Sequence, residues 1–153
     1  TYYHYLYSSR HLSPSPYRQG QTNMTTYLGV DVGEKNHGLA LASGPLATPL
    51  PSITSTSVRA LSEKLVSIAG KHSASTIVLG KPRGKILSIV ERLEESLSSH
   101  SALTVVLHSE NLSTHDALNK LREIGAKRQK LQNDHSYAAC LILEDYLESV
   151  VQI

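Results

Sequence analysis

Residues 27–42, YLGVDVGEKNHGLALA, constrain the fold more than any other stretch of this chain, because they predict two strands joined by a tight turn. One acid, Asp31, lies inside the first strand, although strands rarely contain Asp and a buried, unpaired carboxylate costs several kcal/mol. Alternation places Asp31 on one face with Gly29 and Gly33, which predicts open space that a metal ion or a phosphate would fill. The alternative is that Asp31 caps the bend at Gly33 and Glu34.

The rest of the chain alternates short apolar strands with amphipathic helices. We predict an edge strand at 46–53, a helix at about 58–70 capped by Ser55 and Thr56, a strand at 76–79, a helix from about 85, a strand at 104–107, a helix between Ser113 and Gly125, and a final helix at about 134–151. This order predicts an α/β fold whose mixed five-stranded sheet is antiparallel at its beginning and parallel later, with helices on both faces.

Residues 1–23 differ in composition from the rest: they hold five of the eight tyrosines and no acidic residue. We expect a disordered or non-native extension before one domain at residues 24–153, although their Arg- and Ser-rich makeup also fits an organellar transit peptide. Arg10 and Arg18 are two of the 15 basic residues and all 13 acidic residues follow Met24, so the domain itself is charge-balanced. Nucleic acid would therefore have to bind to local basic patches.

Cys140 is the only cysteine, which excludes a disulfide framework and a zinc site with several cysteines. Its apolar helical surroundings predict a buried, unreactive thiol. No stretch approaches the roughly 20 apolar residues that a membrane span needs. We therefore expect a soluble, cytoplasmic protein without a membrane partner.

Three acidic residues stand where regular structure changes: Asp31 in the first strand, Glu110 just after the last strand, and Asp134 at the start of the final helix. Sites in such sheets gather beyond the carboxyl ends of the parallel strands. Asp31 and Glu110 would meet there if their strands are neighbours, and Asp134 would complete the set. The alternatives are a solvated loop acid at Glu110 and a helix cap at Asp134.

A convergence of these three carboxylates would imply a bound cation. Carboxylates within about 4 Å repel one another by about 4 kcal/mol per pair at an effective dielectric constant of about 20. Oxygen ligands without an accompanying cysteine predict Mg²⁺ or Mn²⁺. Because two such ions can activate a water and stabilise a leaving oxygen, the site would suit phosphodiester hydrolysis.

Four stretches in order, GVDVGEKNHGLAL, IVLGKP, SENLSTHDA and NDHSYAACLILEDYL, resemble the YqgF/RuvX family of Holliday junction resolvases and of nucleases that mature the 5′ end of small-subunit (16S) ribosomal RNA. The resemblance covers residues 26–147. It implies a ribonuclease H-like fold and assigns the metal-binding and catalytic acids to Asp31, Glu110 and Asp134. Two departures, Ser109-Glu110-Asn111 for the usual Asp-Glu-Arg and Asn36 for an arginine, leave the metal site intact and weaken the expected grip on substrate.

Three groups of basic residues in predicted loops near these acids predict contacts with a nucleic-acid backbone. Ordinary basic surface loops are the alternative. His135, beside Asp134, is expected to lie next to the metal ligands without binding the metal itself, where it would orient a water or protonate a leaving group. Its alternative is a polar residue in a first helical turn. The three groups are Lys35; Lys81, Arg83 and Lys85; and Lys127, Arg128 and Lys130.

The leading functional prediction is a nuclease that uses Mg²⁺ or Mn²⁺ on precursor ribosomal RNA in ribosome biogenesis. A Holliday junction resolvase acting on branched DNA would share the site, but its two symmetric cuts require a homodimer, whereas the ribosomal nuclease is compatible with a monomer. A third possibility is a non-catalytic nucleic-acid-binding module, which the residues around Glu110 motivate.

Overall fold

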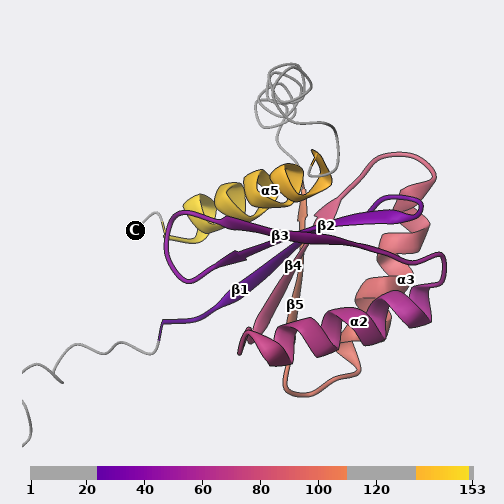
Figure 1. The fold of residues 1–153 in the computed structure, drawn as a ribbon, viewed down its shortest axis with the longest axis horizontal. Coiled ribbons are helices and arrows are strands. Elements are labelled where there is room, and N and C mark those ends of the chain that lie inside the picture. Colours follow the sequence, from indigo (N-terminus) through magenta and orange to yellow (C-terminus); the bar gives the residue numbers. More distant parts are fainter. Residues whose placement is uncertain (1–23, 110–133, 152–153) are drawn as a thin grey trace, which may run out of the picture.

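A five-stranded sheet organises residues 24–109 and 134–151, the parts of the chain that the computed structural model describes (Figure 1). The strand order is β3-β2-β1-β4-β5. The elements are β1 (Tyr27–Asp31), β2 (Asn36–Ala42), β3 (Thr48–Thr54), α2 (Val58–Lys71), β4 (Thr76–Lys81), α3 (Ile86–Ser98), β5 (Thr104–Ser109) and α5 (Asp134–Val151). The predicted extension at 1–23 and the predicted helix between Ser113 and Gly125 lie outside the described residues.

The sheet is mixed, as predicted. Strand β1 pairs antiparallel with β2, and β2 pairs antiparallel with β3, whereas β1, β4 and β5 run parallel. Strand β3 lies at one edge, which suits a strand that carries Pro49 and Pro51 because proline cannot donate a backbone hydrogen bond. The carboxyl ends of the three parallel strands lie together at Asp31, Lys81 and Ser109. We call this end of the sheet, as distinct from its lateral edges, the carboxyl edge.

Two hydrophobic clusters cover the two faces of the sheet. The larger one packs Leu28 and Val30 of β1 against Leu61 and Leu65 of α2 and Leu93 of α3, while α5 covers the opposite face (Figure 1). The predicted alternation of β1 is therefore confirmed, and so are the helices on both faces.

Helix α2 begins at Val58, as predicted, but its cap lies one to two residues later than the predicted one. Its cap is Ser57, whose Oγ accepts a hydrogen bond from the Ala60 N–H at 3.0 Å, and not Ser55 or Thr56. The Ser55 N–H instead donates to the Lys35 carbonyl at 2.9 Å and continues the pairing of β3 with β2. Helix α5 has the predicted bounds.

Glycines on three strands allow α5 to lie close to the sheet. A Cβ at Gly29 would lie 2.9 Å from Cβ of Leu143, and a Cβ at Gly80 would lie 2.6 Å from Cδ1 of Ile142. A Cβ at Gly38 would overlap the carbonyl of His135, on the first turn of α5. The glycines are needed for this close approach of a helix.

The open space predicted beside Asp31 is therefore absent at both of its glycine neighbours. Helix α5 fills the space above Gly29, and a Cβ at Gly33 would overlap the carbonyl oxygen of Asn36 within the turn. Alternation identified the face that carries Asp31, but it does not show which element covers that face.

Cys140 is buried in α5, as predicted. Burial, together with the nearby charge of Glu144, raises the pKa of its thiol to about 11. Because the thiolate is the reactive form, this thiol is unreactive at neutral pH. Across residues 24–109 and 134–151, every helix is too short or too polar to cross a bilayer.

Candidate active site

Asp31 is the last residue of β1 and reaches the carboxyl edge of the sheet. Its side chain is 20% exposed, and its Oδ2 lies 3.2 Å from Nδ1 of His135. An ionised carboxylate can only accept, so the His135 Nδ1–H donates this hydrogen bond. His135, which we expected to lie next to the metal ligands, thus contacts Asp31 directly.

The first turn of α5 is fixed to the sheet by Ser136, which is fully buried. Its Oγ accepts from the Leu39 N–H of β2 at 3.3 Å and donates to the Leu50 carbonyl of β3 at 2.7 Å. Gly38 lies against the His135 carbonyl beside this anchor. These contacts hold His135 above the end of β1 and place Asp134, the first residue of α5, at the carboxyl edge.

The predicted meeting of three acids is only partly within the described residues. Asp31 and the start of α5 at Asp134 lie together, whereas Glu110, which follows the last residue of β5, lies outside them. We expected Asp31 and Glu110 to meet if their strands were neighbours. This condition is not met, because β4 lies between β1, which carries Asp31, and β5, which Glu110 follows. Two strand spacings separate these strands by about 10 Å. The convergence of all three carboxylates stays a prediction.

Asp31 suits a role as one ligand of a hard divalent cation. Its carboxylate supplies oxygen donors of the kind that Mg²⁺ and Mn²⁺ prefer. Among the described residues its one hydrogen bond comes from His135, and no lysine or arginine there forms an ion pair with it. That part of the chain holds no group of three potential ligands, so a complete metal site would also need Glu110 and Asp134.

His37 fixes the turn that follows Asp31, a role that we did not predict from the sequence. The ring is 2% exposed; its Nδ1 accepts from the Gly33 N–H at 3.2 Å and its Nε2–H donates to the Ser55 carbonyl at 3.0 Å. Burial lowers the pKa of His37, and the hydrogen bond to Ser55 opposes this shift. A histidine on an otherwise apolar strand was the available sequence signal.

Acid is expected to destabilise the protein through His37. Its pKa in the folded state lies below the ordinary 6.5, so between these two values the unfolded chain binds more protons. The free energy of unfolding should therefore fall below pH 6.5, with a contribution from His37 of at most about 1.4 kcal/mol per pH unit. Urea unfolding between pH 5 and pH 8 measures this effect. A His37→Phe variant should lose this contribution, and an unchanged pH dependence would contradict it.

Four of the basic residues that we predict to contact nucleic acid lie on segments at the same carboxyl edge as Asp31. Lys35 is exposed in the β1–β2 turn; Lys81 ends β4; Arg83 and Lys85 lie between β4 and α3. Lys127, Arg128 and Lys130 lie outside the described residues. Helices α2 and α3 also begin at this edge, and neither has an acidic residue in its first turn. The positive ends of their dipoles therefore add to the lysines and arginines.

A second histidine–carboxylate pair lies on the same face as Asp31. His108 of β5 and Asp145 of α5 approach to 2.6 Å, and the His108 ring contacts the Tyr146 ring edge-on at 5.6 Å between centroids. His108 is level with Gly80 of β4. We did not predict this pair, because it joins residues 37 positions apart in sequence.

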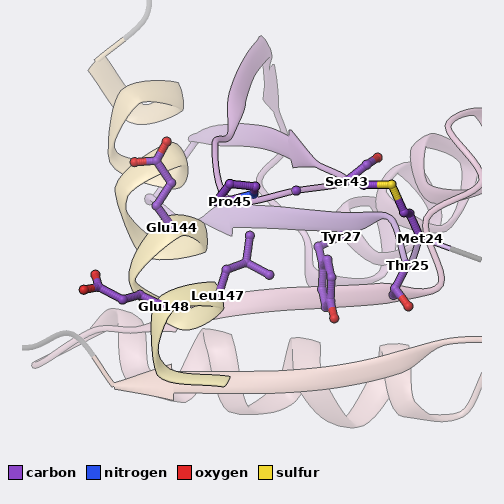
Figure 2. Close-up of a pocket in the computed structure, with 9 residues that line it drawn as sticks. Met24, Thr25, Tyr27, Ser43, Pro45, Glu144, Leu147 and Glu148 are labelled. Carbon is purple, nitrogen blue, oxygen red and sulfur yellow. The ribbon is translucent and has the colours of Figure 1, made fainter. Parts of the chain in front are cut away.

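A cavity of about 680 Å³ lies away from these acids, at the amino end of β1 (Figure 2). Tyr27, Pro45 and Leu147 line it, with Glu144 and Glu148 along α5. Glu144 also accepts a hydrogen bond from the Ala47 N–H at 2.9 Å. Neither Asp31 nor His135 lines this cavity, so it is separate from the candidate active site.

Solved structures show what fold this is. A Fowlpox virus resolvase in complex with Holliday junction DNA aligns with a TM-score of 0.51 at 16% identity, over 84% of this chain and 100% of that chain. Thermus thermophilus RuvC in complex with a Holliday junction substrate aligns with a TM-score of 0.53 at 12% identity, over 82% and 96%. The predicted ribonuclease H-like fold is confirmed.

Sequence comparison shows the family. Proteins named "Putative pre-16S rRNA nuclease" from Rickettsia canadensis and Chlamydia trachomatis serovar L2 are each 33% identical over 135 residues; the matches cover 82% and 80% of this chain and 88% and 91% of the relatives. Residues 25–149 match the family model of RuvX, described as Holliday junction resolvase. With this match over most of its length, the chain belongs to the RuvX family.

Proposed function

We propose that this protein is a metal-dependent nuclease that hydrolyses phosphodiester bonds at the 5′ end of precursor small-subunit (16S) ribosomal RNA. The observation that carries the proposal is the position of Asp31: a partly exposed carboxylate at the carboxyl edge, held by His135 and adjoined by basic turns and helix amino ends. The names of the relatives at 33% identity support the ribosomal substrate. We assign the activity to a domain at residues 24–153.

The catalytic acids would be Asp31, Glu110 and Asp134, which would hold Mg²⁺ or Mn²⁺. When bound, such an ion lowers the pKa of a coordinated water and stabilises the charge on the leaving oxygen. The His135 N–H holds one oxygen of Asp31 and thereby fixes the plane of the carboxylate. The predicted basic residues would bind the phosphates on either side of the cleaved bond. These residues are Lys35, Lys81, Arg83 and Lys85, together with Lys127, Arg128 and Lys130.

A Holliday junction resolvase is the second candidate. The family description and the two junction-bound resolvase structures favour it. It would use the same acids, but paired cuts across a four-way junction need two copies related by symmetry. A binding module without activity is the third candidate. The bacterial relatives support a cytoplasmic location, with an organelle as the alternative.

A cleavage assay with two substrates tests these candidates. We expect the protein to cut an RNA that spans the 5′ end of precursor 16S rRNA with Mg²⁺ or Mn²⁺ and not with EDTA, and to leave a four-way DNA junction intact. We also expect the cation to raise the melting temperature, because a ligand at about 100 times its Kd stabilises the folded state by about 2.7 kcal/mol. Symmetric nicks in the junction would favour the resolvase instead. RNA binding with neither cleavage nor stabilisation would leave only the binding module.

A further inference from the structure

A cavity of about 360 Å³ lies beside the turn that follows Asp31, on the face of the sheet that α2 and α3 cover. Gly33 and His37 line it from the turn and β2, residues 55–59 line it from the amino end of α2, and Arg92 lines it from α3. The two helices lie side by side on this face (Figure 1). We call this cavity the arginine pocket, after Arg59 and Arg92.

Positive charge dominates the arginine pocket. Among the described residues, Arg92 forms no hydrogen bond or ion pair. Arg59 is 3.4 Å from Glu63, but both side chains are highly exposed, and such a pair contributes little. Glu34 is the one acidic residue in the lining. The ring of His37 adds no charge, because each of its nitrogens already has a backbone partner that suits the neutral form.

Helix α2 contributes hydrogen-bond donors to the same pocket. The first N–H groups of a helix have no partner within it, and here the Ser57 side chain satisfies only that of Ala60. The first turn of this 14-residue helix has no acidic residue to offset its dipole. Two arginine residues therefore line the same cavity as the amino end of α2, a combination of charges and donors that suits a phosphate group.

We propose that the arginine pocket binds a backbone phosphate of the nucleic-acid strand that reaches Asp31. This inference rests on the proposed nuclease function. Gly33 lines the pocket and is only two residues from Asp31. Asp31 itself lies on the α5 face, where it contacts His135, and the pocket lies on the opposite face. The bound strand would thus cross the β1–β2 turn, with the cleaved bond on one side and the phosphate in the pocket on the other.

Arginine variants test this proposal through binding alone. A short fluorescein-labelled single-stranded RNA is titrated with the full chain in EDTA, so that cleavage does not interfere. We expect Arg92→Gln to weaken binding by about tenfold and to reduce the slope of log K against log salt concentration by about 1. The double variant with Arg59→Gln should show a larger loss of both. Lys71→Gln, at the other end of α2, is the matched control and should leave both quantities unchanged. Thermal unfolding of each variant checks that the fold is intact.

The outcomes separate this proposal from the proposed function. If the arginine variants bind RNA as tightly as the wild type with the same salt slope, the pocket is not a phosphate site, whether or not the protein cleaves. If the pocket takes up inorganic phosphate, seen by NMR at the Arg92 Nε–H, while RNA affinity is unchanged in the variants, it binds a free anion and the proposal is overturned. If the variants weaken binding and the wild type never cleaves, the pocket stands and the nuclease function fails.

Discussion

Replacing Asp31 by asparagine is expected to reduce RNA cleavage by about 1000-fold or more while leaving the fold unchanged. The amide has nearly the same shape and its oxygen can still accept the His135 hydrogen bond, so the contact with α5 persists. The substitution removes the negative charge that would hold a divalent cation. Single-turnover cleavage with Mg²⁺ or Mn²⁺ measures the loss, and circular dichroism checks the fold.

Glu91→Gln provides the control for this prediction, because it removes one exposed carboxylate from α3, outside the site. We expect it to cleave at the wild-type rate. Asp31→Asn should also abolish the rise in melting temperature that we expect Mn²⁺ to produce in the wild type. Wild-type cleavage by Asp31→Asn would show that the reaction does not depend on this carboxylate, and the proposed mechanism would have to be abandoned.

The local pattern of the sequence predicted those elements whose signals lie within a few residues. Helix α5 has the predicted bounds because its apolar residues recur at helical spacing and polar residues begin it. The cap of α2 could not be chosen locally, since Ser55, Thr56 and Ser57 are all able to cap a helix. The hydrogen bond from the Ser55 N–H to the Lys35 carbonyl, which joins segments 20 positions apart, keeps Ser55 next to β2, and the cap is Ser57.

Relations between distant segments were not available from such patterns. Nothing in the local sequence shows that β4 separates Asp31 from the strand before Glu110, because strand order is a property of the whole sheet. The alternation of β1 likewise predicted which side Gly29 faces but not that α5 covers it. Arg59 and Arg92 were missed because exposed arginines on two helices look like ordinary surface charge until the helices are placed side by side.

Replacing Gly38 by alanine is expected to destabilise the protein by about 3 kcal/mol, near the upper end of overpacking costs. The added Cβ would overlap the carbonyl of His135 and approach the Ser136 amide, and these are backbone atoms that cannot rotate away. The first turn of α5 would have to lift from the sheet, which also strains the Ser136 bonds to β2 and β3. A melting temperature lower by roughly 6–12 °C is expected for a domain of this size.

Gly70→Ala is a matched control for Gly38→Ala, because a Cβ at Gly70 would meet nothing within 4 Å. In the last turn of α2 the same substitution should be neutral or stabilising by up to about 1 kcal/mol. A lifted α5 would also separate His135 from Asp31, so Gly38→Ala should cleave more slowly even well below its melting temperature. Equal melting temperatures for the two variants would show that the stability of the protein does not depend on the close contact of α5 with β2. Another contact would then have to hold this helix next to Asp31.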